Sequence, residues 1–187
     1  VGADGVVREA VAFHWHDLDV AAAVSAIVPV PVHIANDANA AALAARTYGQ
    51  PSAEDLALVR IGQGIGSGVI VGGMLVTGPR YTAGEIGHVL VEPGGEVCRC
   101  GRRGCLEVVA AVPYVRQRLA DDPSSASEVL SRAGRALGEV MSPVVAALGL
   151  EQVVVSGPLD IVGGVFLDEM RAAIDLHSLA IVTDDLE

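Results

Sequence analysis

Three cysteines and one histidine that fall within eighteen consecutive residues constrain this chain more than any other feature. The cysteines are Cys98, Cys100 and Cys105, and His88 precedes the first of them by ten positions. Glycines between the cysteines let the backbone curl, so that all three sulfur atoms can face one point. One imidazole and three thiolates form a ligand set typical of a closed tetrahedral zinc site. The spacing therefore predicts a structural zinc knuckle over residues 88–107, with a thiol redox switch as the alternative.

The composition narrows the class of protein further. Hydrophobic residues make up 51% of the chain but aromatic residues only 3%, so the core must consist of Ala, Val, Leu and Ile. The formal net charge of −11 repels phosphate backbones, and we do not expect this chain itself to contact nucleic acid. An odd, clustered set of cysteines argues against a secreted disulfide framework. The apolar runs are too interrupted to span a membrane, and we expect a cytoplasmic protein.

The hydrophobic pattern predicts an α/β protein in which a meander of strands is followed by alternating helices and strands. Residues 1–7 are expected to form a turn and a short extended piece, and residues 13–17 an exposed loop. The expected helices cover residues 21–27, 37–48, 128–148 and 167–174. The expected strands cover residues 32–35, 56–61, 69–71, 74–76, 89–91 and 153–156.

The stretch Asn36-Asp37-Ala38-Asn39 lies at a predicted junction between a strand and a helix. Ligands of open α/β sheets bind at such junctions, outside the carboxyl ends of the strands. Asp37, in the first helical turn, is well placed to accept a proton from a substrate hydroxyl. The alternative is that these residues do no more than cap the helix.

A glycine-rich stretch runs from Gly62 to Gly68 between two predicted strands. Such a stretch can form a backbone nest for a phosphate group, and a glycine-rich hairpin without a ligand is the alternative. The stretch lacks the Gly-Lys-Ser or Gly-Lys-Thr of a Walker loop. It is also not a dinucleotide fingerprint, because no helix follows it.

Two carboxylates, Glu85 and Glu107, each lie close in sequence to a predicted metal ligand. Carboxylates in this position can accept hydrogen bonds from the hydroxyl groups of a sugar. They can also orient the ligands of the metal through hydrogen bonds. We favour the binding of a small molecule, because both carboxylates lie within the same set of motifs.

Taken together and in this order, the motifs resemble those of the ROK family of repressors, open reading frames and sugar kinases. The resemblance spans residues 5–174, and the most specific parts are Gly84-Glu85-Ile86-Gly87-His88 and Cys98-Arg-Cys-Gly-Arg-Arg-Gly-Cys105-Leu-Glu107. It implies an actin-like, ribonuclease-H-like fold of two α/β lobes. Residues 1–35 would then be the remnant of the N-terminal lobe, and residues 36–187 the C-terminal lobe with its zinc knuckle.

The resemblance also assigns roles to single residues. Zinc would be structural and held by the histidine and the three cysteines. In kinase members the aspartate at Asp37 is the general base, and Mg-ATP is the phosphoryl donor. The sugar would be bound by Asn36, Asp37, Glu85, His88 and Glu107. The nucleotide and its phosphates would face Gly62, Gln63, Gly64, Gly66 and Gly157.

The chain departs from the kinase pattern at two places. The first phosphate loop of the family, Asp-x-Gly-x-Thr, is absent, and we expect the chain to be a fragment without phosphoryl-transfer activity. Gln63 stands where kinases commonly carry Thr, and repressor members often vary here. We therefore expect the sugar-sensing effector domain of a ROK-type transcriptional regulator, with an ATP-dependent sugar kinase as the alternative and a zinc module without a sugar as a third possibility.

The expected partners follow from the same resemblance. The ligand would be a monosaccharide or a sugar derivative, and the protein would form a homo-oligomer, either a dimer or a tetramer. DNA would be bound only through a helix-turn-helix upstream of Val1, which is missing from this chain.

Overall fold

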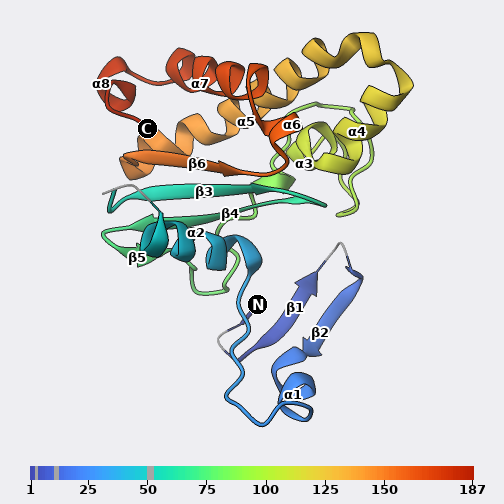
Figure 1. Ribbon diagram of the computed structural model, residues 1–187, viewed down its shortest axis with the longest axis vertical. Coiled ribbons are helices and arrows are strands. Elements are labelled where there is room, and N and C mark those ends of the chain that lie inside the picture. The colour runs from blue at the N-terminus through green and yellow to red at the C-terminus, as the bar shows by residue number, and fades with distance from the viewer. Residues whose placement is uncertain (3, 11–12, 50–52) are drawn as a thin grey trace.

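A mixed four-stranded sheet forms the centre of the molecule, as the computed structural model shows for residues 1–2, 4–10, 13–49 and 53–187 (Figure 1). The strands lie in the order β5-β4-β3-β6. Strands β3, β4 and β5 form an antiparallel meander, whereas β6 returns from far along the chain to pair in parallel with β3. Their bounds are β3 Leu56–Ile61, β4 Ile65–Val71, β5 Met74–Leu75 and β6 Gln152–Ser156.

Strand β3 separates two apolar cores. Its residues alternate between the two faces of the sheet, so that Ala57, Val59 and Ile61 join the larger core. Leu56 and Leu58 join a smaller core on the opposite face. The strand is buried along its whole length except at Arg60, which is the pattern expected of a central strand covered on both sides.

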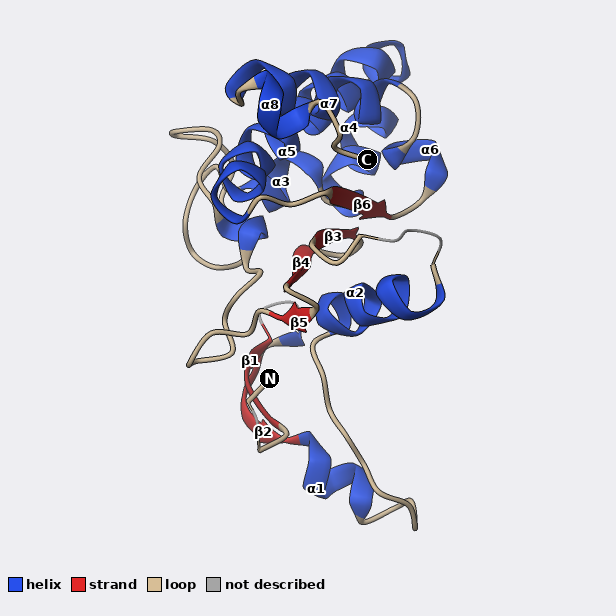
Figure 2. Cartoon of the chain, turned by 90° about the vertical axis from the view of Figure 1, so that its left-hand side faces the viewer, coloured by secondary structure: helices blue, strands red, loops and turns tan. Residues whose placement is uncertain are grey.

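Helices cover both faces of the sheet (Figures 1 and 2). Helices α5 (Ala126–Leu148) and α7 (Val165–His177) lie on the larger core, and α2 (Asp37–Tyr48) lies on the smaller one. Two glycines of α5 let α7 approach closely. A Cβ atom at Gly134 would lie 2.1 Å from the carbonyl oxygen of Phe166, and one at Gly138 would lie 2.4 Å from that of Met170.

Four shorter helices complete the body of the molecule. The bounds are α3 Leu106–Ala110, α4 Val112–Asp121, α6 Leu159–Val162 and α8 Ala180–Thr183. Sequence analysis predicted none of them. Helix α4 accepts Pro113 in its first turn, where a missing N–H group leaves no hydrogen bond unmade. Among the residues that the structure describes, no helix is long and apolar enough to cross a membrane.

The N-terminal residues form a separate small unit below the main sheet (Figure 1). Strands β1 (Val6–Ala10) and β2 (Trp15–Asp19) pair only with each other, and α1 (Val20–Ser25) follows directly. The expected loop over residues 13–17 is therefore wrong in part, because residues 15–17 lie in β2. Its expected exposure is correct, since all five residues of β2 are exposed.

Two expected strands do not form. Residues 32–35 are extended but pair with no strand among the described residues, and they follow prolines that cannot donate backbone hydrogen bonds. Residues 89–91 make a single bridge, between Leu90 and Cys105. Several predicted segments are longer than expected, most clearly α7, which extends at both ends, and β4, which begins at Ile65 instead of 69.

The early start of β4 has a packing reason. Gly66 and Gly68 lie within the strand rather than in a loop, and they allow α2 to lie directly on it. A Cβ atom at Gly68 would lie 2.6 Å from both the carbonyl oxygen of Ala38 and the Cβ atom of Ala42. These glycines therefore bring the N-terminus of α2 close to the sheet, and only residues 62–64 form the turn between β3 and β4.

Candidate functional site

His88 and the three cysteines converge on one point at the edge of the larger core. Their ligand atoms all lie within 4.8 Å of one another. The Sγ atom of Cys98 lies 3.6 Å from Nδ1 of His88, and the Sγ atoms of Cys100 and Cys105 lie 3.7 Å apart. A disulfide would need about 2.05 Å between sulfurs, so all three cysteines are free thiols.

These distances fit a tetrahedral zinc ion. Zinc–sulfur bonds of about 2.3 Å and zinc–nitrogen bonds of about 2.0 Å place neighbouring ligand atoms roughly 3.5 to 3.8 Å apart at tetrahedral angles. Both short separations fall in this range. The three sulfurs and one nitrogen also match the composition of a closed structural site, which leaves no open position for a substrate.

Burial makes two of the three thiols poor acids when no metal is present. Burial raises the pKa of the Cys98 thiol to about 12, and burial together with the neighbouring Cys100 thiol raises the pKa of Cys105. At Cys100 burial also opposes ionisation, but the backbone N–H of Arg102 and the two other thiols outweigh it and lower the pKa. A bound zinc ion would supply the positive charge that buried thiolates need.

Glycines close the knuckle loop. Gly101 and Gly104 have φ angles of +84° and +71°, which residues with a Cβ atom rarely adopt. The backbone N–H of Cys98 donates to the carbonyl oxygen of Arg102 at 2.7 Å, so the loop returns on itself between the second and third cysteines. A Cβ atom at Gly104 would lie 1.7 Å from the carbonyl oxygen of Glu92. The positive φ angles of both glycines and the close approach at Gly104 therefore allow the loop to close in this form.

The segment that carries Glu85 and His88 is fixed directly on strand β4. Gly84 has a φ angle of +91°, and its carbonyl oxygen accepts a hydrogen bond of 2.9 Å from the backbone N–H of Ser67. A short 3-10 helix, Ile86–His88, then turns the imidazole toward the cysteines. The exposed Glu85 immediately precedes this helix. One anchor on the sheet therefore positions a metal ligand and a carboxylate together.

Glu107 connects the knuckle to the turn between β3 and β4. Its side chain is only 7% exposed, and it lies in the first turn of α3, directly after the last cysteine. Oε1 lies 3.7 Å from the Sγ atom of Cys98. On its other side, Oε2 would lie 2.6 Å from a Cβ atom at Gly64. Gly64 therefore leaves the space that this buried carboxylate occupies.

We expect Gly64→Ala to displace the Glu107 carboxylate, because the new methyl group and Oε2 cannot occupy the same space. If Glu107 binds a sugar, the affinity falls by roughly tenfold or more, the usual consequence of losing a hydrogen bond to a charged group. Calorimetric titration measures this loss. Gly66→Ala is the matched control, since its Cβ atom would meet Ala38 at 3.4 Å. Equal affinities of the two variants would contradict this role of Gly64.

Asn36 and Asp37 lie at the N-terminus of α2, on the other side of the same turn. Oδ1 of Asn36 accepts hydrogen bonds from the backbone N–H groups of Ala38 and Asn39, so Asn36 is the helix cap. Oδ1 of Asp37 accepts a hydrogen bond of 2.9 Å from the Ala38 N–H. Oδ2 of Asp37 accepts one of 2.6 Å from Nη1 of Arg60. Sequence analysis missed Arg60, although a lone charge inside an apolar strand was a usable signal.

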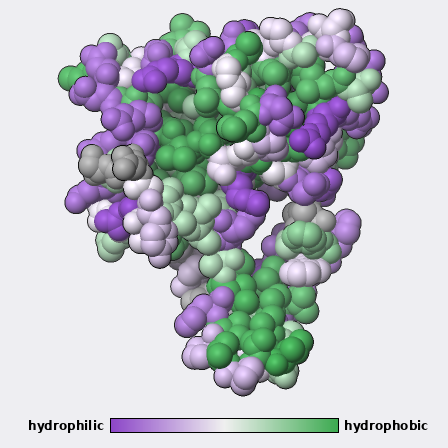
Figure 3. Space-filling model, viewed as in Figure 1, coloured by the Kyte–Doolittle hydropathy of each residue, from purple (hydrophilic) through white to green (hydrophobic). Residues whose placement is uncertain are grey.

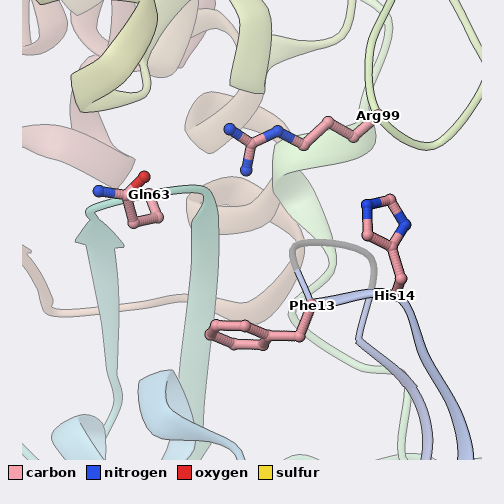
Figure 4. Close-up of a pocket in the computed structure, with 4 residues that line it drawn as sticks. All are labelled: Phe13, His14, Gln63 and Arg99. Carbon is pink, nitrogen blue, oxygen red and sulfur yellow. The ribbon is translucent and has the colours of Figure 1, made fainter.

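A cleft lies between the β1–β2 hairpin and the body of the molecule (Figure 3). It contains a cavity of about 510 Å³ lined by Phe13, His14, Gln63 and Arg99. Figure 4 shows these four side chains gathered around the cavity, with the guanidinium group of Arg99 extended toward Gln63. Gln63 is thus the residue of the glycine-rich turn that faces the hairpin. Sequence analysis did not foresee the contributions of Phe13, His14 and Arg99.

Several predicted site residues lie near the turn at residues 62–64. The four predicted metal ligands and Glu107 lie together, whereas Asp37 lies with Arg60 and is preceded by Asn36. Gly157 directly follows β6 and lies beside the start of the turn, since a Cβ atom there would approach the carbonyl oxygen of Ile61 to 2.9 Å. None of the other predicted residues lines the cavity with Gln63.

Comparison with known proteins gives one consistent result. The sequence profile of the ROK family matches residues 3–180. A glucokinase of Thermotoga maritima is 38% identical over 118 residues, which cover 62% of this chain and 37% of that protein. The DNA-binding transcriptional dual regulator NagC of Escherichia coli is 31% identical over 177 residues, which cover 80% of this chain and 44% of that protein.

Solved structures agree with the sequence comparison. A ROK family transcriptional regulator, described as a homologue of the Escherichia coli MLC protein, superposes with a TM-score of 0.85 at 23% identity. The match covers 98% of this chain and 54% of that one. ROK sugar kinases of known structure share the fold as well. The chain thus spans about half or less of the Thermotoga glucokinase and of the two regulators. It covers 62% and 66% of the two sugar kinases of known structure.

Proposed function

The chain belongs to the ROK family, and we propose that it is the sugar-sensing effector part of a ROK-type transcriptional regulator. The proposed ligand is a monosaccharide or a derivative of one. Asn36, Asp37, Glu85, His88 and Glu107 are the proposed contacts. A structural zinc ion held by His88 and the three cysteines would fix the last two of these contacts.

The position of Glu107 carries the proposal that a sugar binds. A carboxylate that is 7% exposed and lies between a knuckle thiol and Gly64 is held far more rigidly than a solvated side chain. Carboxylate oxygens accept hydrogen bonds from hydroxyl groups. Rigid, pre-positioned acceptors lower the cost of ordering a site when the ligand binds. The same rigidity explains why a zinc knuckle would belong to a sugar site.

Gln63 favours sensing over phosphoryl transfer. It occupies the exposed tip of the turn that, by resemblance, faces the nucleotide phosphates. Kinases of the family commonly carry a small threonine hydroxyl here, and the longer amide projects instead into the cavity shared with Arg99 (Figure 4). Phosphoryl transfer depends on close positioning of the nucleotide. A bulkier side chain at this turn works against such positioning.

A sugar kinase is the second candidate function. Its support is the presence of Asp37 at the start of α2, together with relatives named glucokinase and N-acetylmannosamine kinase. In that case Asp37 would accept the proton of the attacking sugar hydroxyl, and Mg-ATP would supply the phosphoryl group. ADP release in the presence of Mg-ATP and a sugar would establish this function in place of sensing.

Asp37→Asn tests the proposed contact to the sugar. We expect a weaker complex by roughly 10- to 100-fold, because hydrogen bonds to a charged acceptor contribute about 1.5–3 kcal/mol. Calorimetric titration with glucose, N-acetylglucosamine, N-acetylmannosamine and xylose measures the change. Asp55→Asn is the control, since Asp55 is bonded to the backbone N–H of Gly72 at the distant end of the meander. An unchanged affinity in Asp37→Asn would remove Asp37 from the site.

The remaining partners are part of the same proposal. DNA would be contacted by a helix-turn-helix in a longer protein, and sugar binding would shift the population between DNA-bound and released forms. The regulator would act as a dimer or tetramer in the cytoplasm. Sedimentation velocity with and without sugar measures the oligomeric state.

A further inference from the structure

Arg60 is the only charged residue within strand β3 and its only exposed one. The strand alternation places it on the face that also carries Leu56 and Leu58, which pack beneath α2. Its side chain therefore runs toward the N-terminus of α2, where Asp37 begins the helix. An arginine in this position brings a fixed positive charge to the residue proposed to contact the sugar.

The contact between Arg60 and Asp37 is short and well defined. Nη1 of Arg60 lies 2.6 Å from Oδ2 of Asp37, slightly shorter than the usual charge-assisted hydrogen bond of about 2.7–2.9 Å. Oδ1 of Asp37 already accepts the N–H of Ala38 at 2.9 Å. Each oxygen of the carboxylate therefore has one donor, and the plane of the group is fixed by both. Each oxygen keeps a second lone pair for another donor.

The pair is poorly suited to a role in stability alone. The side chains of Arg60 and Asp37 are 48% and 67% exposed, and exposed ion pairs contribute little to the free energy of unfolding. What the geometry does support is a carboxylate held in one orientation for a further hydrogen bond.

We propose that Arg60 is a positioning residue of the sugar site, and that the Arg60–Asp37 pair recognises two adjacent hydroxyl groups of the ligand. Asp37 accepts a hydrogen bond from the first hydroxyl, and a second N–H of the guanidinium group donates to its neighbour. An ionised aspartate can only accept hydrogen bonds, and arginine can only donate them. The pair therefore fixes which of the two hydroxyl groups donates a hydrogen bond and which one accepts it. This inference rests on the proposed function, since it assumes that Asp37 contacts a sugar.

The test is a double-mutant cycle on sugar affinity. Calorimetric titrations of the whole chain with glucose, N-acetylglucosamine, N-acetylmannosamine and xylose are made for the wild type, Arg60→Gln, Asp37→Asn and the double variant. We expect Arg60→Gln to weaken binding by roughly tenfold, a typical coupling for residues in contact. In the Asp37→Asn background the same substitution has a smaller effect, because only the direct contact with the second hydroxyl is left to lose. Arg60→Lys restores part of the affinity, because it keeps the charge but not the planar fork of donors.

Two further experiments distinguish the specific contacts of Arg60 from a general effect of its positive charge. Arg46→Gln removes one positive charge from the last turn of the same helix, α2, and leaves the affinity unchanged. Monodeoxy forms of the tightest-binding sugar identify the diol. For one of them, the difference in affinity between the wild type and Arg60→Gln narrows, because the hydroxyl that Arg60 addresses is gone and only its effect on Asp37 remains. The comparison of monodeoxy sugars can be made even if Asp37→Asn binds too weakly to be measured.

The outcomes separate this inference from the proposed function. Wild-type binding with no loss in Arg60→Gln would overturn the positioning role and leave the proposed function intact. A tenfold loss that persists undiminished in the Asp37→Asn background would also overturn it, because Arg60 would then act independently of Asp37. A wild-type chain that binds none of the four sugars would overturn the proposed function and this inference with it.

Discussion

Cys98→Ser is expected to abolish stoichiometric zinc binding and to unfold the knuckle. Cys98 lies at the centre of the cluster, since its Sγ atom contacts both Nδ1 of His88 and the carboxylate of Glu107. A serine hydroxyl is a poor zinc ligand, and structural zinc contributes about 10–16 kcal/mol of apparent binding free energy in small zinc domains. With the metal lost, His88 and Glu107 are no longer held in place, so sugar binding is lost as well.

Metal analysis of the purified protein, thermal unfolding and sugar titration together measure this effect. Arg102→Gln is the matched control, because Arg102 lies in the same loop but is exposed and supplies no ligand. Removal of zinc from the wild-type protein with a chelator should reproduce the Cys98→Ser result. Retained sugar binding after complete removal of zinc would refute the coupling between knuckle and sugar site.

Gly84→Ala is expected to be among the most damaging single substitutions outside the proposed metal ligands. Its φ angle of +91° disfavours any side chain, and a Cβ atom there would lie 1.9 Å from the carbonyl oxygen of Ser67. Backbone atoms of a central strand cannot move aside as a flexible side chain can. The segment that carries Glu85 and His88 must therefore leave strand β4, with a loss of more than about 3 kcal/mol in the free energy of unfolding.

Gly78→Ala is the control that separates the steric clash with Ser67 from the strain of a positive φ angle. Gly78 has a similar positive φ angle of +68°, but a Cβ atom there would meet nothing within 4 Å. We expect this control to lose only about 1–2 kcal/mol, the cost of the left-handed conformation. Denaturant unfolding measures both variants. Equal losses would show that the contact with Ser67 does not hold the segment on the sheet.

Sequence reasoning located most of the central elements, and the bounds of β3 and α2 are as predicted. The apolar run at 56–61 and the capped helix at 37–48 follow from local rules of periodicity and capping, and both are confirmed. Gly66 and Gly68 were expected to lie in a loop, because local rules assign glycine to loops. Here the glycines lie in β4 to admit α2, and such a tertiary reason leaves no signal in the local pattern.

The candidate site also combines features that the sequence predicts with features that depend on the fold. The cysteine spacing indicated a metal cluster, and the structure brings the four predicted ligands within 4.8 Å. The ion pair between Arg60 and Asp37 joins residues 23 positions apart. The cavity at Gln63 depends on how the hairpin faces the body of the molecule. Both require knowledge of the fold, and sequence spacing alone does not provide it.

Titration of the zinc-loaded chain with monosaccharides in the absence of ATP tests the central claim most directly. If the chain is a sugar-sensing domain, at least one of glucose, N-acetylglucosamine, N-acetylmannosamine and xylose binds saturably, with one site per chain. ATP is not required for this binding. Heats of dilution alone for every sugar, from a protein with a full complement of zinc, would contradict the claim and leave the knuckle as a purely structural element.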